Sequence, residues 1–372
     1  MKIKKIAIVG SGTAGSASAL FLARDGHEVT LFEKIERPSA VGAGVMMQPS
    51  GMGVLRKLGL EEEVLQAGAR VERLHATTPT GRMVLDLSYE KLDSKYYGVG
   101  LHRGSLFQSL YGAVLSQGIK VHVGVEVVNV DESESGDCTL IGSDGSRFSG
   151  FDFVVVASGA RTELREAVGI PHTVSEYDWG ALWFVAESRD IQSGDCLRQH
   201  LDGAHTMLGF LPTGLGPLGG APLTSVFWSI RVDMVAAFRS RGLDCWKERV
   251  LELAPKSGPL LEQITTIDQL LFAQYFDVVL KRPHEGRVIF LGDAAHATSP
   301  QLGQGCNLAL VDAETLARAV AKSETVDAAF ALYERQRRPQ TRYYQWATRF
   351  LTPFFQSNSR VLAWLRDSFM GL

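Results

Sequence analysis

The N-terminal glycine motif places the strongest constraint on the fold of this chain. Residues 4–9 have the pattern of a buried strand, and Gly10, Gly12 and Gly15 follow in the pattern G-x-G-x-x-G. A helical pattern comes next, and a second strand pattern ends at Glu33. In this order the glycines permit a tight turn, approach of the backbone to a pyrophosphate and close helix packing, while the acidic residue can accept a ribose hydroxyl. The segment therefore predicts a Rossmann-type dinucleotide site.

A second glycine-rich segment, residues 287–313, predicts another part of the same site. Its first five residues have a strand pattern that leads into Gly292 and Asp293, and Gly303 and Gly305 open a helix that runs to about Ala321. The start of a helix leaves backbone N–H groups free and carries partial positive charge. A carboxylate and an anion-favouring helix end suit a ligand with hydroxyls at one part and delocalised negative charge at another, as in a reduced flavin.

Residues 292–313, GDAAHATSPQLGQGCNLALVDA, closely resemble the second flavin motif of the FAD-dependent aromatic hydroxylases. These are the para-hydroxybenzoate hydroxylase-like class A flavoprotein monooxygenases. The resemblance implies that Asp293 bonds the ribityl chain and that Pro300 and residues 303–307 surround the isoalloxazine ring. His296 also lies in the motif, and we interpret it, like Cys306, as packing or loop support.

Two more segments resemble the same family. Residues 101–106 are expected to begin a helix, and the resemblance implies that Arg103 contacts a phosphate or the ribityl chain of FAD. Residues 152–165, DFVVVASGARTELR, carry Ser158 where the family has an aspartate that serves both the flavin and the reduced nicotinamide. This departure predicts altered handling of NADH or NADPH. The predicted cofactor-binding residues are Gly10, Gly12, Gly15, Glu33, Val45, Arg103, Gly159, Asp293, Pro300, Gly303, Gly305 and Asn307.

The expected fold is α/β, with a Rossmann-type FAD-binding domain interleaved with a mostly antiparallel sheet that binds the substrate, followed by C-terminal helices. The predicted domains are an FAD-binding domain at 1–70, 100–170 and 285–335, a substrate-binding domain at 71–99 and 171–284, and a C-terminal helical segment at 336–372. No side chain is predicted to be catalytic with certainty, since the flavin performs the chemistry. The candidate pocket residues are Gln48, His75, His205, Phe210, Pro212 and Arg231.

A second G-x-G-x-x-G, at residues 214–219, does not predict a second dinucleotide site. Pro217 lies inside it, no helical pattern follows, and strand patterns flank it, so we expect a hairpin loop. The chain therefore has one dinucleotide fold and no separate nicotinamide domain. We find no Trp-x-Trp-x-Ile-Pro motif, which argues against a tryptophan halogenase.

Composition excludes several classes of protein. A net charge of −3 gives no broad basic surface for nucleic acid, and the four cysteines lack metal-site spacing, so no metal is expected. We expect a cytoplasmic protein, either a monomer or a homodimer. The exception to this charge balance is the segment from Arg335 to the C-terminus, which has seven arginines and one acidic residue, with aromatic residues between them. Such a helix can lie on a membrane surface, but packing across the two domains or in a dimer contact is the more usual arrangement.

The function expected from the sequence is that of an FAD-dependent monooxygenase. The resemblance implies that NADH or NADPH reduces FAD and that a flavin C4a-hydroperoxide transfers one oxygen from O2 to an aromatic or other electron-rich small molecule. Two alternatives stay open. The first is another FAD-dependent redox enzyme, such as a dehydrogenase, an isoprenoid reductase or a halogenase. The second is a non-catalytic flavoprotein that holds a product for a partner enzyme.

Overall fold

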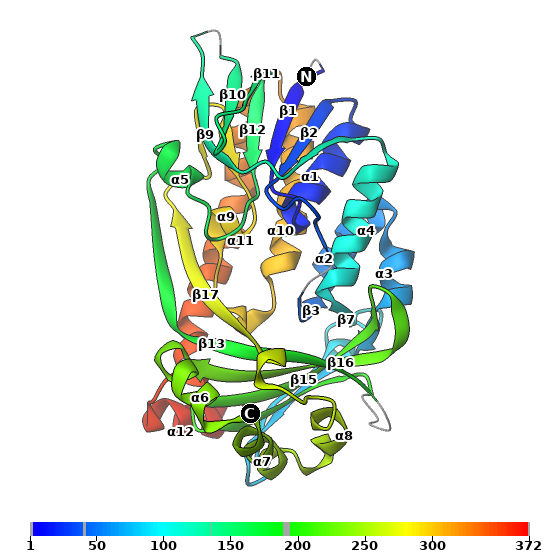
Figure 1. The fold of residues 1–372 in the computed structure, drawn as a ribbon, viewed down its shortest axis with the longest axis vertical. Helices are drawn as coiled ribbons and strands as arrows, with labels where there is room; N and C mark the ends of the chain where they lie inside the picture. Colours follow the sequence, from blue (N-terminus) through cyan, green and yellow to red (C-terminus); the bar gives the residue numbers. More distant parts are fainter. Residues whose placement is uncertain (1–2, 40–41, 135, 189–193, 371–372) are drawn as a thin grey trace.

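The computed structural model describes residues 3–39, 42–134, 136–188 and 194–370. Figure 1 shows two bodies, an upper one built on a parallel sheet with helices and a lower one built on a broad sheet covered by short helices. Strands β13 (His172–Glu187) and β17 (Leu271–Leu280) and helix α11 (Val326–Phe355) run from one body to the other. The chain crosses between the bodies several times, which is why the upper body is assembled from segments far apart in the sequence.

The upper body contains a six-stranded sheet whose strands are parallel except for one edge strand. In spatial order its strands are β18 (His284–Glu285), β19 (Val288–Phe290), β12 (Phe153–Val156), β1 (Lys5–Val9), β2 (Glu28–Glu33) and β8 (Lys120–Val123). The four residues of β12 are all buried, as expected for a parallel strand covered on both faces. The carboxyl ends of β1, β12 and β19 therefore meet along one edge.

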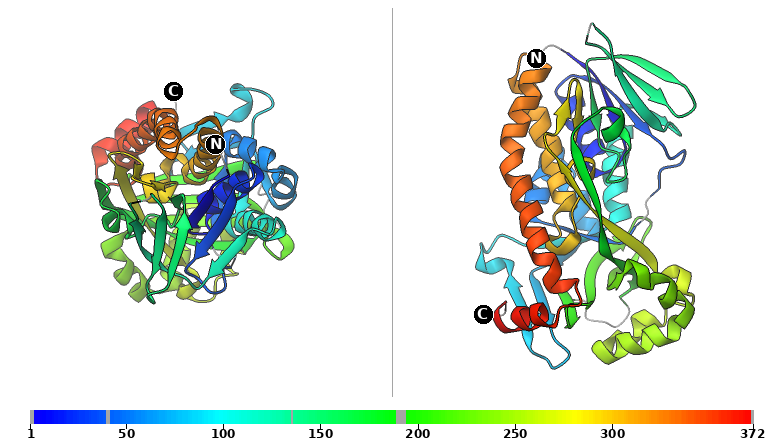
Figure 2. Two further views of the ribbon diagram at one scale, coloured as in Figure 1. Left: turned by 90° about the horizontal axis from the view of Figure 1, so that it is seen from above. Right: turned by 90° about the vertical axis from the view of Figure 1, so that its left-hand side faces the viewer.

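The two faces of this sheet are covered differently. Ile6 and Ile8 of β1 pack in the core with helices α1 (Thr13–Arg24), α4 (Arg103–Ser116) and α10 (Gly305–Lys322). Ala7 and Val9 face a second core formed with a three-stranded antiparallel sheet. Its strands are β9 (Val127–Glu132), β10 (Cys138–Gly142) and β11 (Arg147–Phe151), which project from the top of the molecule (Figure 2).

A small antiparallel sheet joins the two bodies. Its strands, in order, are β3 (Gly44–Met47), β7 (Gly98–His102) and β4 (Ala69–Val71), and helices α2 (Pro49–Leu58) and α3 (Glu61–Ala67) lie beside it. Met46 and Val71 form a buried cluster with Leu211 of the lower sheet. This sheet thus connects the glycine-rich half of the molecule to the lower sheet through apolar contacts.

The lower body is a seven-stranded sheet, antiparallel except for the pairing of β14 with β5. Its strands, in order, are β17, β13, β16 (Gly219–Arg231), β15 (Thr206–Gly216), β14 (Cys196–Asp202), β5 (Arg73–Thr77) and β6 (Met83–Ser88). One face is covered by α6 (Val235–Arg241), α7 (Leu243–Leu253) and α8 (Gly258–Leu261), which bury Trp246 and Val250 against Leu208 and Val226. The other face is directed toward β3 and β4.

Helix α11 follows α10 and spans both bodies, and after a short break α12 (Arg360–Phe369) ends the described chain. Thr325 caps α11 by accepting a hydrogen bond from the Ala328 N–H at 3.2 Å. Within the described ranges, no helix is both long enough and apolar enough to cross a lipid bilayer.

The expected α/β fold class and the hairpin at the second glycine motif are confirmed, since residues 214–219 join β15 to β16. The prediction that a helix begins at residues 101–106 is wrong in part, because Leu101 and His102 end strand β7. The His102 backbone is extended, and its Nδ1 accepts the Gly104 N–H, so the helix begins at Arg103. Strand β14 was not predicted, and the domain boundaries stay a prediction.

Gly209 gives a direct test of the packing in the lower sheet. It lies opposite Phe227, and a Cβ on Gly209 would stand 1.9 Å from the phenyl ring. We expect Gly209→Ala to lower the free energy of unfolding by about 1–3 kcal/mol. Gly112→Ala is the matched control: a Cβ there meets no atom within 4 Å, and the change should stabilise α4 by about 0.5–1 kcal/mol. Urea unfolding of both variants measures the difference. A free energy of unfolding that Gly209→Ala leaves unchanged would contradict the close contact of Gly209 with Phe227.

Candidate functional site

Three turns from distant parts of the chain meet at the carboxyl ends of β1, β12 and β19. A Cβ on Gly10 would approach the Ala157 carbonyl oxygen to 2.6 Å, and one on Gly292 would approach the Ala14 Cβ to 3.1 Å. The turn after β1 therefore packs against the backbone after β12, and the turn after β19 packs against the first turn of α1. In open α/β sheets, ligands bind at this edge of the strands.

The first turn has the geometry of a pyrophosphate cradle. Gly10 has a φ of +100°, and its N–H donates to the Phe32 carbonyl at 2.8 Å. A Cβ on Gly15 would lie 1.8 Å from the Gly10 carbonyl oxygen, so α1 can approach the turn only with glycine there. A Cβ on Gly12 would meet no protein atom within 4 Å. Gly12 thus leaves open space at the start of α1, which fits the requirement of a dinucleotide phosphate.

Glu33 has a second role that the sequence did not reveal. Its Oε2 accepts the Ser11 N–H at 2.9 Å and the Ser11 hydroxyl at 2.7 Å, and its Oε1 accepts the Ile35 N–H at 3.0 Å. The carboxylate therefore fixes the glycine turn to the end of β2. Oε2 uses both of its acceptor positions on Ser11, whereas Oε1 keeps one lone pair that can accept a hydrogen bond from a ribose hydroxyl.

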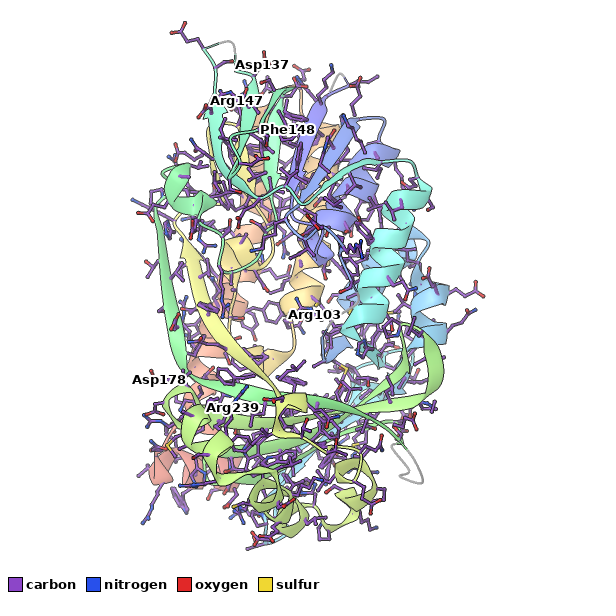
Figure 3. The ribbon with its side chains drawn as sticks, viewed as in Figure 1. Arg103, Asp137, Arg147, Phe148, Asp178 and Arg239 are labelled. Atoms are coloured by element: carbon purple, nitrogen blue, oxygen red, sulfur yellow. The ribbon has the colours of Figure 1, made fainter. Side chains whose placement is uncertain are left out.

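Asp293 and Arg103 approach the start of α10 from two sides. Asp293 begins the short helix α9 (Asp293–His296); it is exposed, and its Oδ1 lies 3.8 Å from the position of a Cβ on Gly305. Arg103 begins α4, and its N–H donates to the Ala43 carbonyl at 2.9 Å, close to Val45 of β3. Figure 3 places Arg103 between α4 and the start of α10.

The charges of these two residues also act on Cys306, in the first turn of α10. Burial raises the pKa of the Cys306 thiol, and the positive charge of Arg103 opposes this effect while the Asp293 carboxylate adds to it. A protonated thiol agrees with the interpretation of Cys306 as a packing residue. The charges of Arg103 and Asp293 therefore both act at the start of α10.

The loop before α10 is shaped by glycine and proline. Pro300 opens a single helical turn, and Gly303 ends it in the left-handed conformation, with a φ of +59°. The Leu308 N–H bonds to the Gln304 carbonyl at 2.8 Å, so it is the first N–H satisfied within the helix. The N–H groups of residues 305–307 donate to no carbonyl in the described structure and point out of the N-terminal end of the helix. They provide the anion-favouring end expected for a flavin ring.

The Asn307 side chain has a structural role, in addition to the predicted position of this residue beside the flavin ring. It is fully buried, its Oδ1 accepts the Gln48 N–H at 2.8 Å, and its Nδ2 donates to the carbonyls of Met46 at 3.0 Å and Gly303 at 3.1 Å. Both amide hydrogens are used within the protein. Asn307 therefore holds β3 and the start of α2 against α10, and only its backbone N–H stays available to a ligand.

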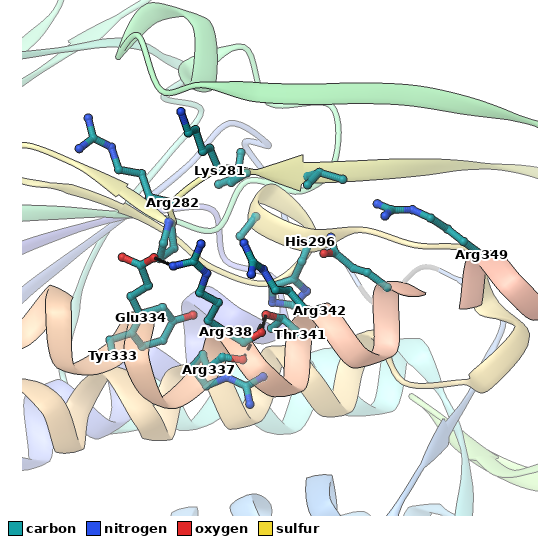
Figure 4. Close-up of a pocket in the computed structure, with 15 residues that line it drawn as sticks. Lys281, Arg282, His296, Tyr333, Glu334, Arg337, Arg338, Thr341, Arg342 and Arg349 are labelled. Carbon is teal, nitrogen blue, oxygen red and sulfur yellow. Dashed lines mark hydrogen bonds and ion pairs between the residues drawn. The ribbon is translucent and has the colours of Figure 1, made fainter. Parts of the chain in front are cut away.

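A buried carboxylate that the sequence reading assigned no role supports the Asp293 loop. The Asp312 side chain is inaccessible; its Oδ2 accepts the Gly292 N–H at 2.9 Å and His296 Nε2 at 2.5 Å, and its Oδ1 accepts Arg337 Nε at 2.6 Å. Burial favours a neutral Asp312, but the charges of His296 and Arg337 outweigh it and hold the pKa of this carboxyl well below its usual range. Burial lowers the pKa of His296, but the Asp312 carboxylate raises it by more, so the pKa of His296 is above its usual value. His296 and Arg337 are both drawn in Figure 4. His296 thus acts as loop support, as predicted.

The third segment reaches the same loop through Arg165. This side chain is buried, and it donates to the Ala294 carbonyl at 2.9 Å and to the Ala160 carbonyl at 2.5 Å. Burial lowers the pKa of Arg165. Ser158 is exposed beside Gly159, and its hydroxyl donates to the Thr162 hydroxyl at 2.8 Å. The substitution of the family aspartate by Ser158 therefore leaves the turn closed by a local hydrogen bond.

The sheet face directed toward β3 carries polar groups that the sequence reading missed. A Cβ on Gly44 would meet Thr213 Cγ2 at 2.3 Å and Ser225 Oγ at 2.7 Å, so the strands touch there. Within the described chain, both hydroxyls are buried without a hydrogen-bond partner. Leu211 lies on the same face, and so do Trp183 and Phe227, whose rings are 5.0 Å apart. The two hydroxyls lie next to Gly44 of β3, on the face of the sheet opposite to α6–α8.

Four of the predicted pocket residues lie elsewhere. Phe210 packs with the cluster under α7, since alternation along β15 turns it away from the face of Leu211 and Thr213. His75 is on the same side of the sheet, because β5 and β14 place it beside Arg198, which pairs with Phe210.

His205 and Arg231 line a separate cavity of about 650 Å³ between the lower sheet and α6–α7. No predicted flavin-motif residue lines it. By contrast, Gln48 is close to the start of α10, because its N–H donates to the Asn307 side chain. The Pro212 carbonyl packs against Gly100 of β7.

Comparisons with known proteins identify relatives over nearly the whole chain. A family model described as FAD binding domain matches residues 4–345. A putative FAD-dependent monooxygenase, YetM of Bacillus subtilis, is 28% identical over 91% of this chain and 90% of that protein. The 3-hydroxybenzoate 6-hydroxylase of Klebsiella oxytoca is 26% identical over 94% and 88% of the two chains. The crystal structure of PqsL, a probable FAD-dependent monooxygenase from Pseudomonas aeruginosa, has a TM-score of 0.84 at 20% identity and covers 99% of each chain, which shows the shared fold.

The open glycine and the free carboxylate predict two variants that fold but bind FAD poorly. Gly12→Val fills space that no protein atom occupies, and Asp293→Ala removes an exposed side chain. Both should keep the wild-type melting temperature of the apoprotein. Loss of a hydrogen bond to a charged group costs about 1.5–3 kcal/mol, so Asp293→Ala should weaken FAD binding roughly tenfold to hundredfold. Flavin absorbance of the purified variants reports occupancy, with Glu248→Ala on α7 as the control. Full occupancy in both would reject the site.

The Asp312 cluster predicts how stability depends on pH. The lowered pKa of Asp312 contributes stability above the unfolded value of about 4, which is lost as pH falls through the folded pKa. The raised pKa of His296 contributes stability below about 6.5, which is lost as pH rises through its folded pKa. The cluster is thus most stabilising between about pH 4 and 6.5.

Asp312→Asn should lower the free energy of unfolding by about 3–5 kcal/mol, because it leaves Arg337 and His296 buried without their counter-ion. It should also flatten the pH profile of the melting temperature. Asp131→Asn, at an exposed ion pair with Arg147, is the control. Identical profiles for wild type and Asp312→Asn would show that the cluster does not set the pH dependence.

Proposed function

Because this chain belongs to the FAD binding domain family and is an FAD-dependent monooxygenase, we propose that its substrate is an aromatic or other electron-rich small molecule and that NADH or NADPH is its electron donor. One oxygen atom of O2 enters the product and the other leaves as water. The relative that is named for hydroxylation of 3-hydroxybenzoate supports an aromatic substrate. Direct support comes from the open Gly12 turn, the exposed Asp293 carboxylate and the free N–H groups of α10, which converge at one edge of the sheet.

FAD, when bound, supplies the reaction with O2, and the protein supplies the binding and orientation. The Gly12 turn would hold the pyrophosphate and Glu33 the ribose, while Asp293 and Arg103 would hold the ribityl chain and its neighbouring phosphate. The N–H groups at the start of α10 would favour negative charge on the ring. Asn307 and Asp312 position these groups from behind and would not touch the cofactor with their side chains.

The wall formed by the lower sheet would hold the substrate. Thr213 and Ser225 present hydroxyls that the described protein leaves unpaired, and these can bond polar substituents on a ring. Leu211, Trp183 and Phe227 would cover the apolar part of the substrate and exclude water from the reacting atoms. Substrate choice would depend on this face of β15 and β16, and not on His205 or Arg231.

The electron donor would bind without a fold of its own. The second glycine motif is a hairpin, so the described chain has a single dinucleotide fold, and Ser158 stands exposed at its edge where the family has aspartate. NADH or NADPH would then meet the flavin transiently at the surface. We further propose a cytoplasmic location, where the thiols of Cys138, Cys196, Cys245 and Cys306 would stay reduced.

Isotope labelling tests this function. With any substrate that stimulates NADH or NADPH oxidation by the purified holoenzyme, turnover under ¹⁸O₂ should give a product that carries one labelled oxygen atom, read by mass spectrometry. Thr213→Val, which removes a hydroxyl but keeps the shape, should raise KM by about fivefold to tenfold if that hydroxyl bonds the substrate. A product without label, or equal turnover in the absence of oxygen, would favour a dehydrogenase or reductase.

A further inference from the structure

Helices α11 and α12 expose an unusual number of large aromatic side chains. Tyr343 is 60% exposed, Trp346 62% and Phe350 55%, and on α12 both Trp364 and Phe369 are 60% exposed. The rings of Trp346 and Phe350 stack with centroids 5.6 Å apart. Clustered exposed apolar side chains of this size mark a surface that another body covers.

The aromatic side chains of α11 lie on the side of the helix that faces away from the protein core. Gln345, Thr348 and Thr352 of α11 are buried against the protein, so the buried face of this stretch is largely polar. The spacing of residues 343, 346 and 350 puts the aromatic rings on the opposite face, in solvent. An ordinary surface helix has the reverse arrangement. We call the exposed side chains of residues 343, 346, 350, 364 and 369 the aromatic face.

Positive charge surrounds the aromatic face. Within the part of the chain that the structure describes, Arg335, Arg342 and Arg360 are exposed and have no ion-pair partner. The whole chain carries a net charge of −3, yet the segment from Arg335 onward has seven arginines and one acidic residue. Arg337 and Arg366 are buried, but the other five of these arginines are exposed, so positive charge exceeds negative charge around the aromatic face.

A basic cavity of about 260 Å³ lies between α11 and the end of β17 (Figure 4), and Arg342 lies between this cavity and Trp346, one helical turn further along α11. Lys281 and Arg282 line it from the end of β17, and Arg338, Arg342 and Arg349 line it from α11. Trp346 lies between Arg342 and Arg349 on the same helix. Figure 4 shows Arg338 and Arg342 extending from α11 toward the segment of Lys281 and Arg282. Clustered arginine and lysine side chains bind phosphate oxygens.

We propose that this surface docks the enzyme on a membrane that contains anionic phospholipids. Trp, Tyr and Phe prefer the boundary between lipid headgroups and acyl chains, and arginines beside them are attracted to the negative surface. Arg282, Arg338 and Arg349 are paired with Glu285, Glu334 and Asp277, so Arg342, which has no ion-pair partner in the described chain, binds the lipid phosphate while the aromatic face enters the interface. Contact is peripheral, since it uses the side of two helices. Figure 2 shows α11 and α12 on the same side of the molecule, with α12 projecting outward.

A second copy of the chain fits this surface less well. A two-fold contact through the aromatic face would bring the same arginine-rich helices of two copies together. Like charges in contact oppose association. The sequence alone favoured packing of this segment across the two domains or in a dimer; the exposure of its rings excludes the first of these for the aromatic face and the charge argues against the second.

Vesicle sedimentation of the FAD-loaded, full-length protein tests the proposal. The protein should bind vesicles of phosphatidylcholine mixed with phosphatidylglycerol, release at high salt, and bind pure phosphatidylcholine weakly. Arg342→Gln should lower the partition coefficient about fivefold, and Trp346→Ala combined with Phe350→Ala should lower it further. Leu218→Ala, at the 99% exposed hairpin tip, and Arg147→Gln, an exposed arginine of β11, are matched controls and should bind like wild type.

The same variants distinguish the other occupants. Circular dichroism and flavin absorbance establish that each variant folds and keeps FAD. If the wild-type protein does not bind anionic vesicles, or if Arg342→Gln and the Trp346→Ala, Phe350→Ala double variant bind as well as wild type, the proposal is overturned. Stabilisation by inorganic phosphate without vesicle binding would identify a site for a free anion instead. A dimer in light scattering that Trp346→Ala converts to a monomer, without vesicle binding, would identify the face as a self-association surface.

Discussion

The Asp312 carboxylate, buried in α10, fixes the geometry on which the flavin site depends. It accepts donors from three places: the Gly292 backbone, His296 in α9 and Arg337 in α11. A buried charge is costly unless such partners surround it. Because the three partners are distributed over separate elements, the carboxylate is stable only when all of them are in place. It thereby holds the turn at Gly292, whose φ of +57° suits glycine, and directs Asp293 outward to the solvent-facing side of that turn.

The site divides its polar residues into those that build it and those that face the ligand. Asn307, Arg165 and Asp312 are buried, and protein groups use their hydrogen-bonding capacity. Gly12 and Asp293 instead leave room for the ligand, because Gly12 has no side chain and the Asp293 carboxylate is exposed. A motif seen in sequence mixes both kinds. The buried residues hold the ligand-facing residues in position, since a loop bearing an unpaired carboxylate has few contacts of its own.

The sequence was informative wherever the constraint was local or steric. Gly10 and Gly15 could be predicted because a tight turn and a helix in contact with it admit no Cβ, whatever the rest of the chain does. It was much less informative about which face of a strand a residue occupies. Phe210 and Leu211 differ by one position, yet they lie on opposite faces of the sheet, and that choice depends on pairing with strands elsewhere in the chain.

The role of Asn307 was equally hidden, because its partners Met46 and Gln48 precede it by about 260 residues. Only the folded chain brings them together. Thr213 and Ser225 gave no signal at all in the sequence, since an ordinary threonine and serine in a strand are common and become noteworthy only when burial leaves their hydroxyls without a partner.

Arg337 also bears on how much of this chain can be removed. It lies in α11, just beyond the predicted end of the FAD-binding domain at residue 335, yet its guanidinium neutralises Asp312 inside that domain. Truncation at the predicted boundary would leave a buried carboxylate facing one histidine. Helix α11 is thus an integral part of the nucleotide-binding half, and a nascent chain still on the ribosome cannot complete that half until α11 has emerged.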